Sequence, residues 1–372
     1  MTDEARVPVD EPVPEWAVRY NAGDYPRQAV TGDAVALALD TTGPHGTVRA
    51  LLVERGGEPY RGLDAWPGGF MEWQDDADTR QAAIRELREE TGVEAPEFVE
   101  ALGSYSRNGR DPRQFAGYRD PASGRWVARG ARVTTAAYLM LTHDPRGPAA
   151  PTGADDAASA HWADVYGYLP WEDLRDGTRE RCAGVASALW AWAGEDAGRR
   201  ARVDDLFGLA EWNEERTAER WALLMEAGLV PEARRDRWGR AEPREGDAAF
   251  GRAMAFDHRE ILADALGRIR GKIKYTPAAL MALTGPEATL DELQAACEAI
   301  AGRPLHRSNF RRAVAPSGRG KSRAPRIVAR TGRRRPRLGR GPGVAPEVYR
   351  FLPDAVRARL DTSIRFPWLP LA

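Results

Sequence analysis

The chain has 372 residues, more than one ordinary core needs, so we expect two or three folding units. Its N-terminus lacks the basic start and apolar core of a secretory signal, and no run reaches the roughly 18 apolar residues of a membrane span. Cys182 and Cys297 are too few and too far apart for a disulfide framework. The composition therefore predicts a cytoplasmic protein that does not enter a membrane.

The net charge of −1 conceals a strong asymmetry. Between Arg303 and Arg340 there are thirteen arginines and Lys321 but no Asp or Glu, so this segment carries +14 and the remainder −15. An acidic body with one strongly basic end is typical of a protein that contacts a polyanion locally. A disordered basic tail is the alternative for the Gly/Arg-rich part of the segment.

After a loose tail at residues 1–30, the patterns predict a unit with strands and a helix. The apolar runs AVALALD and TVRALLVERG, separated by the turn-rich TTGPHG, predict two strands. Asp78 and Gln81 have capping-box spacing at the start of a helix, which Gly92 is placed to end. A loop rich in Arg, Gly, Asp and Pro is expected at 104–129, followed by the strand RVTTAAYLML.

The remainder of the chain is predicted to be mainly helical. Residues 169–251 show helical spacing of apolar residues and hold six of the twelve tryptophans, which indicates a folded helical insert. Residues 252–352 contain three helical segments, one with a Thr289–Glu292 capping box, and then a basic loop and the strand EVYRFL. This order is typical of a winged helix-turn-helix domain. Residues 353–372 are expected to form a C-terminal tail.

The first chemical signal is the glutamate cluster in IRELREETGV. Glu86, Glu89 and Glu90 stand at i, i+3 and i+4, so on a helix their carboxylates share one face. Mg²⁺ and Mn²⁺ prefer such oxygen ligands and can polarise a diphosphate toward attack by water. Many surface helices carry the same spacing as a solvated face, and the cluster alone favours that interpretation.

Its context favours the metal site. RELREETGV agrees at every specified position with the second half of the Nudix box, G-x5-E-x7-R-E-U-x-E-E-x-G-U with U aliphatic, and LDAWPGGFME resembles the glycine loop before the box. Upstream, Asp75 stands where the box has Glu, and nine residues instead of seven separate it from Arg85. The resemblance implies an α+β fold, with a Nudix α/β/α sandwich and mixed sheet over residues 31–168.

The same resemblance assigns roles to residues of the box. It implies that Mg²⁺ or Mn²⁺ is held, and catalysis performed, by Glu86, Glu89 and Glu90. Arg85 is expected to hold these carboxylates by charge pairing. Gly68 and Gly69 are expected to let the backbone turn sharply beside the phosphates of a ligand.

The loop after the box supplies candidate ligand-binding residues. SRNGRDPRQ contains Arg110, Asp111 and Arg113, and it resembles a GRDPR stretch in a Nudix branch that handles ADP-ribose and related nucleotides. An arginine here is suited to bidentate pairing with a phosphate. A solvated loop with an incidental Arg–Asp pair is the alternative.

The C-terminal part is similar to a known DNA-binding domain. AFDH, YTPAAL, TLDELQ and RSNFRR resemble, at the same relative positions, the winged helix of the Nudix-related transcriptional regulators of bacterial NAD metabolism. In that family the Nudix domain senses ADP-ribose or a relative, and the dimeric C-terminal domain binds an operator. The resemblance covers residues 31–168 and 252–352 but not the insert. It implies a homodimer on double-stranded DNA, cytoplasmic and nucleoid-associated when bound.

The residue pattern of RSNFRR fits a recognition helix. Phe310 and Val314 are expected to pack inward, whereas Arg307 is suited to read guanine and Asn309 to read adenine or contact a phosphate. The other basic residues are expected mainly to neutralise phosphates: Arg311, Arg312, Lys321, Arg333, Arg334 and Arg335. RNA is a weaker candidate, because no aromatic stacking surface accompanies the basic segment.

Two functions therefore stay open. The first is a DNA-binding regulator whose Nudix domain binds ADP-ribose or a related nucleotide, with possible retained hydrolysis. The second is a Mg²⁺-dependent hydrolase of the ADP-ribose pyrophosphatase type, whose C-terminal domain serves dimerisation or docking. The basic winged-helix pattern favours the first, and the preserved RELREETG favours the second.

Overall fold

The structure is a computed structural model that describes residues 19, 28–41, 46–72, 74–145, 157–175, 179–315, 327–335, 345–357, 366 and 368–369. Most of the two predicted tails, and Lys321, lie outside the described residues. No helix in the described ranges is long and apolar enough to cross a membrane.

The N-terminal part is built on one mixed sheet. Its strands follow the order β3–β2–β1–β8–β5, with β4 paired to β1 and β9 paired to β2. Their bounds are β1 Ala29–Asp40, β2 Thr47–Arg55, β3 Asp64–Ala65, β4 Gly68–Phe70, β5 Phe98–Tyr105, β8 Val133–Thr142 and β9 Ala157–Asp164. β1 and β8 are parallel and the other pairs antiparallel. The predicted α+β class with a mixed sheet is confirmed, and the two N-terminal apolar runs are β1 and β2.

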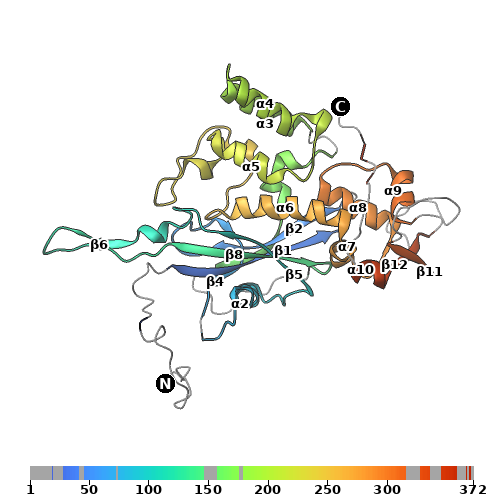
Figure 1. Cartoon of the computed structure of the whole chain (residues 1–372), viewed down its shortest axis with the longest axis horizontal. Helices are drawn as coiled ribbons and strands as arrows, with labels where there is room; N and C mark the ends of the chain where they lie inside the picture. The colour runs from blue at the N-terminus through green and yellow to red at the C-terminus, as the bar shows by residue number, and fades with distance from the viewer. Residues whose placement is uncertain are drawn as a thin grey trace, which may run out of the picture.

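Helices cover both faces of this sheet (Figure 1). The bounds are α2 Thr79–Thr91, α6 His258–Tyr275, α7 Pro277–Thr284 and α8 Leu290–Ala301. On one face α2 buries Ala83 and Leu87 against β1 and β8. On the other face α6, α7 and α8 contact the sheet and share its larger hydrophobic core. The C-terminal helices thus complete the fold around the sheet.

Side-chain caps fix the ends of α2 and α8. The Asp78 side chain accepts a hydrogen bond from the Gln81 N–H at 2.9 Å, while the Gln81 side chain accepts from the Ala77 N–H and not from the Asp78 N–H. Gly92 ends α2 in the left-handed region, with φ 66°. At α8 both bonds of the predicted Thr289–Glu292 capping box are present.

The loop expected at 104–129 is more regular than its composition indicated. β5 extends to Tyr105, and η2 (Pro112–Phe115) precedes a hairpin of β6 (Gly117–Arg119) and β7 (Trp126–Ala128). The hairpin projects from the end of the sheet far from the C-terminal strands (Figure 1). Polar and turn residues therefore form a paired ribbon here, because its strands satisfy each other's backbone groups.

The insert is helical, as its apolar spacing predicted. Its helices are α3 Arg179–Ala193, α4 Ala197–Phe207 and α5 Thr217–Glu226. Short 3₁₀ turns flank them: η3 Val165–Gly167, η4 Pro170–Glu172, η5 Leu209–Glu211, η6 Pro231–Arg234 and η7 Asp247–Phe250. Trp171 and Trp221 stack with ring centroids 6.5 Å apart in the core shared with the sheet and the C-terminal helices.

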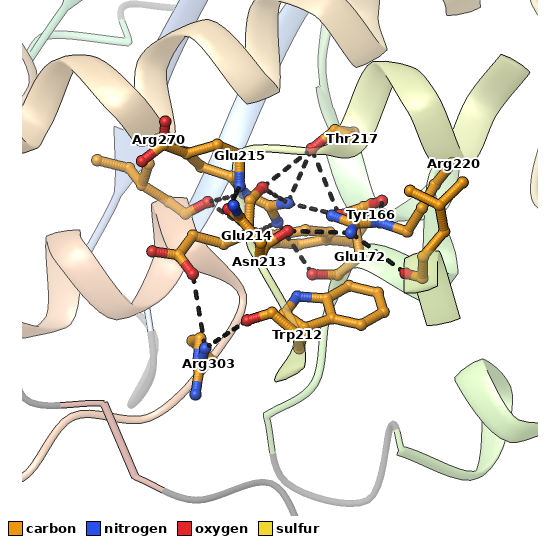
Figure 2. Close-up of polar contacts among 12 residues, drawn as sticks. Tyr166, Glu172, Trp212, Asn213, Glu214, Glu215, Thr217, Arg220, Arg270 and Arg303 are labelled. Atoms are coloured by element: carbon orange, nitrogen blue, oxygen red, sulfur yellow. Dashed lines mark hydrogen bonds and ion pairs between the residues drawn. The ribbon is translucent and has the colours of Figure 1, made fainter. Parts of the chain in front are cut away.

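A buried ionic network joins the insert to α6 (Figure 2). The Glu172 carboxylate accepts two hydrogen bonds from Arg220 of α5, at 2.6 and 2.9 Å, and one from Arg270 of α6, at 2.5 Å. All three residues are fully buried. Arg270 also donates to the Ile300 carbonyl at the end of α8, at 2.8 Å. The network therefore ties η4, α5, α6 and α8 together.

At the end of the molecule opposite the β6–β7 hairpin, α9 (Arg307–Val314) lies beside a three-stranded sheet (Figure 1). The sheet has the order β10–β12–β11, with β10 Glu287–Thr289, β11 Val328–Arg334 and β12 Glu347–Phe351, and α10 (Pro353–Arg357) follows it. Phe310 and Val314 are buried, as predicted. α7 is a helix that the pattern did not separate from its neighbours.

Candidate functional site

A cavity of about 400 Å³ opens beside β1, β4, α2 and the start of α6. It collects most of the residues that the sequence indicated for metal and ligand binding: Gly68, Gly69, Glu86, Glu90, Arg110, Asp111 and Arg113. Arg85 and Glu89 do not line it. Segments distant in sequence, the box and the GRDPR loop, therefore meet at one site.

Two of the three box glutamates face this cavity. Glu90 is buried and accepts a hydrogen bond from the Gly68 N–H at 2.9 Å, and burial raises its pKa to about 8. Burial also raises the pKa of Glu86. A Cβ at Gly69 would lie 2.1 Å from Glu86 Oε1, so a side chain at this position would displace the carboxylate. The glycine is thus needed for close approach of the carboxylate to the backbone.

Arg85 organises the outer side of the cluster. It donates to Glu86 at 2.8 Å and to Glu89 at 3.1 Å, and it pairs through two nitrogens with Asp76. The spacing of the box indicated Asp75 as the upstream acid, whereas Asp75 is exposed and Asp76 is buried. The Arg85 hydrogen bond lowers the pKa of Asp76. Asp76, one residue after the position indicated by the box, is therefore the acid that pairs with Arg85.

The donor set fits a hard divalent cation only in part. In the described ranges no three His, Cys, Asp or Glu side chains converge closely enough to hold a metal ion. Glu89 is held by Arg85 and 43% of its side chain is exposed. Glu86 and Glu90 remain as cavity-lining oxygen donors. Two carboxylates suit Mg²⁺, which keeps several waters and often takes further oxygens from phosphates.

The two arginines of the GRDPR loop are already paired within the chain. Arg110 donates to both oxygens of Asp257 at 2.8 and 2.6 Å, and both residues are buried. Arg113 pairs with the buried Asp111 at 2.8 Å, and its guanidinium lies 5.0 Å from the ring centroid of Phe70. Bidentate pairing of either arginine with a phosphate therefore requires that its present partner, the carboxylate of Asp257 or Asp111, be displaced.

His258 and Asp33 belong to the cavity and were missed from the sequence. His258 Nδ1 accepts a hydrogen bond from the Trp66 N–H at 2.9 Å, which leaves the proton of a neutral ring on Nε2. Burial holds its pKa well below the usual value. Nε2 lies 3.5 Å from Asp33 Oδ2, and burial raises the pKa of Asp33 to about 7.

Phe256 lies beside His258 in the wall of the cavity. It has φ 50°, a left-handed conformation that is unusual for a bulky residue. Arg235 of the insert donates to its carbonyl at 2.6 Å. AFDH, residues 255–258, held the signal for this wall, but only as part of a family likeness. Asp33 is a single acid in an apolar strand and carries no pattern.

The predicted DNA-binding arginines lie near one another on a surface, the arginine surface, which we define as the exposed and half-buried arginines of α9, β11 with Arg335 after it, and β12: Arg307, Arg311, Arg312, Arg330, Arg333, Arg334, Arg335 and Arg350. Arg307, Arg311 and Arg312 lie on α9, where Asn309 accepts a hydrogen bond from Arg312. Arg333 and Arg334 end β11 and Arg335 follows it. A second cavity, of about 580 Å³, lies between α9, the start of α8 and β11–β12.

Comparison with known proteins agrees with the fold of the first part. Residues 32–180 match the NUDIX domain family. The chain therefore contains a NUDIX domain. The chain is similar to a solved structure of a MutT/nudix family protein from Enterococcus faecalis. The match covers 91% of this chain and 91% of that protein, with a TM-score of 0.50 and 21% sequence identity. That likeness concerns the fold and extends beyond the NUDIX domain.

Two curated relatives match shorter stretches. The chain is 33% identical over 101 residues to the ADPR responsive transcriptional repressor NtrR of Acinetobacter baylyi, which is 27% of this chain and 38% of the relative. It is 42% identical over 65 residues to the ADP-ribose pyrophosphatase of Methanocaldococcus jannaschii, 18% of this chain and 37% of the relative. The matches thus span well under half the length of either relative.

Proposed function

We propose that this protein is a ligand-responsive, DNA-binding transcriptional regulator whose NUDIX domain binds ADP-ribose or a related nucleotide. The observation that carries the proposal is that the residues beginning α6 wall the NUDIX cavity, while the chain beyond α6 bears the arginine surface. The likeness to an ADP-ribose-responsive repressor supports it. The helices α7, α8 and α9 with β10–β12–β11 act as the winged helix.

The coupling runs through α6. At its start, Asp257 and His258 contact Arg110 and Trp66 of the NUDIX domain. Twelve residues on, Arg270 bonds the end of α8, which leads into α9. We infer two conformations of the protein, which differ in the position of α6 and in the arrangement of the arginine surface. A ligand with higher affinity for one conformation therefore shifts the equilibrium toward it.

The remaining assignments follow the same proposal. The ligand domain comprises residues 31–168, the insert 169–251 and the DNA-binding domain 252–352. The regulator acts as a homodimer in the cytoplasm and is nucleoid-associated when it binds DNA. Arg307 and Asn309 read bases, and the other arginines of the surface bind phosphates. Lys321 is assigned to phosphate binding on sequence alone.

Binding of fluorescent duplex DNA selected from a random pool, measured with and without ADP-ribose, tests the proposal. We expect tight binding that ADP-ribose changes by fivefold or more, the usual scale of allosteric coupling, about 1–3 kcal/mol. Arg311→Ala is expected to weaken binding and to lower the salt slope by about 1. A chain that selects no duplex, or whose DNA affinity ignores ADP-ribose, would refute the regulator.

A second candidate is a Mg²⁺-dependent hydrolase of the ADP-ribose pyrophosphatase type, with the C-terminal domain used for dimerisation or docking. The carboxylates of the buried Glu90 and the half-buried Glu86 favour it, because a divalent cation offsets the cost of holding them charged. We propose that these two residues would hold Mg²⁺ or Mn²⁺, which would supply Lewis-acid activation of a water beside a diphosphate. Glu89 joins them if Arg85 releases it.

Release of AMP and ribose 5-phosphate from ADP-ribose and Mg²⁺ decides between the candidates. Turnover at an ordinary enzymatic rate, with DNA affinity indifferent to ADP-ribose, makes the protein an enzyme first. Binding without turnover, with a changed DNA affinity, makes it a sensor. Slow turnover together with the effect on DNA means that hydrolysis clears the signal.

A further inference from the structure

Acidic side chains from other parts of the chain partly balance the charge of the most basic segment. Between Arg303 and Arg340 there is no Asp or Glu. Carboxylates from before and after that segment nevertheless reach the arginine surface: Glu287, Asp291, Glu292 and Glu347. Three of them lie in β10 and the first turn of α8, beside α9 and β11. Acidic groups are thus built into the surface proposed to bind a polyanion.

Asp291 holds two arginines of α9 at once. Its Oδ1 accepts hydrogen bonds from Arg307 Nη2 at 3.0 Å and from Arg311 Nη2 at 2.9 Å. The side chains are 49%, 63% and 43% exposed, so water and ions reach all three. Such exposed pairs contribute little to stability, because solvent screens their attraction. They are therefore weak enough to exchange for another anion.

Glu292 likewise holds Arg335, the arginine that follows β11. It accepts hydrogen bonds from Arg335 Nη1 at 2.7 and 2.9 Å, while its Oε2 also accepts from the Thr289 N–H in the capping box. Glu287 pairs with Arg333 and, at 3.1 Å, with Arg350. Each of these carboxylates keeps a guanidinium folded back onto the protein.

These pairs surround the cavity between α9 and β11–β12. Its lining includes five arginines, Arg307, Arg311, Arg330, Arg334 and Arg335. Asp291, Glu292 and Glu347 line it as well. The carboxylates occupy the positions around these guanidinium groups that a phosphate oxygen would take, because both anions offer oxygens that accept from the same N–H groups.

We propose that Asp291 and Glu292 limit the affinity of this surface for DNA, because they hold the DNA-contacting arginines in internal ion pairs that a phosphate must displace. This inference rests on the proposed function as a DNA-binding regulator. Phosphates are present in every duplex, so the exchange lowers affinity for DNA of any sequence. A selected duplex bears the same cost and is bound tightly because its base edges add contacts, so the ion pairs set how tightly any DNA binds without changing the ratio of the two affinities.

Conservative substitutions test the idea on the full chain. Asp291→Asn and Glu292→Gln remove one charge each, and Gln retains the capping-box role of Glu292. Asp205→Asn is the matched control, because Asp205 forms an exposed pair with Arg216 on the distant insert. The measurements are fluorescence anisotropy with a random-sequence duplex and with a selected duplex over a series of salt concentrations, and thermal unfolding of each variant.

We expect each variant to bind the random duplex about twofold to fivefold more tightly, the range set by one exposed ion pair. The selected duplex gains by a similar factor, because the same ion pairs are displaced in both complexes. The slope of log K against log salt steepens by up to about 0.9 for each charge removed, since a carboxylate freed beside phosphates retains a cation. Asp205→Asn changes neither quantity.

Unchanged or weaker binding of the random duplex by both variants, with wild-type unfolding, overturns the inference and makes Asp291 and Glu292 mere supports of the arginines. If one variant fails to fold, the other decides alone. A wild-type chain that binds neither duplex at low salt instead removes the proposed function, which is a different result.

Discussion

Replacement of Glu172 by Gln addresses the connection on which the proposed coupling depends. Glu172 is the common counter-ion of Arg220 and Arg270, and none of the three is exposed to solvent. The amide that replaces one carboxylate oxygen would point N–H groups at guanidinium N–H groups. Two buried cations would then lack a charge partner, although main-chain carbonyls still accept from them.

The expected loss of unfolding free energy is about 3–5 kcal/mol, the range for breaking a buried ion pair by removing one partner. Burial raises the pKa of Glu172, but Arg220 and Arg270 outweigh burial and hold this pKa below its usual value. A depressed folded-state pKa stabilises the fold above the unfolded value, about 4.3 for Glu. The difference between wild type and variant should therefore be full at pH 7 and shrink as pH falls below about 4.

Equilibrium unfolding in urea, followed by tryptophan fluorescence, measures this loss, and Trp212 reports locally because the Arg220 guanidinium lies 3.9 Å from its ring centroid. Glu226→Gln is the control, since Glu226 forms an ion pair with Arg202 in which both side chains are 47% exposed. The control should lose less than about 1 kcal/mol. Equal losses in the two variants, or a Glu172→Gln effect that does not depend on pH, would refute the reasoning.

Three further predictions concern the cavity and a helix end. If ADP-ribose is hydrolysed, Glu90→Gln should abolish turnover measured by AMP release, while Glu89→Gln, which lies outside the cavity, should keep part of it; the reverse order would contradict the metal assignment. Phe70 lines the cavity although it is 43% exposed, and it is expected to stack on a nucleobase. Calorimetry should therefore show that Phe70→Leu weakens the binding of ADP-ribose by about 1–3 kcal/mol but leaves the binding of ribose 5-phosphate unchanged. Equal weakening of the binding of both ligands would exclude stacking. Thr289→Ala should lower the unfolding free energy by about 1 kcal/mol in urea through loss of the α8 cap, and no change would mean that the cap is dispensable.

Features that depend on neighbours in sequence were predictable. The helical face of Glu86 and Glu90, the Gly92 terminus of α2 and the capping box at Thr289 each rest on residues within four positions. Arg85 was likewise correctly linked to Glu86 and Glu89. The contact between Arg85 and Asp76 was not predicted, because it depends on the path of the longer loop before the box and not on helical spacing.

Features that depend on distant pairing were not predictable from one sequence. Trp66 and His258 are 192 positions apart and meet because the chain just before α6 pairs with β3, where the Ala255 N–H donates to the Asp64 carbonyl at 2.9 Å. Arg110 appeared free for a ligand, since Asp257 gave no sign of being its partner. Charge counting along the chain located the basic segment but not its ion partners for the same reason, because these lie in β10, the first turn of α8 and β12.

The arginines of this protein occur in two energetic settings, and the difference explains how one chain can be both rigid and responsive. Arg270 is buried with Glu172, where loss of either partner leaves an uncompensated charge, so the pair fixes how the insert, α6 and α8 meet. Arg307 and Arg311 share the exposed Asp291, where water and salt weaken the attraction and a phosphate can replace the carboxylate. On the proposed function, a movement of α6 would be carried to α8, and so toward α9, through the hydrogen bond from Arg270 to the Ile300 carbonyl, whereas DNA would be bound by exchange of the weak pairs.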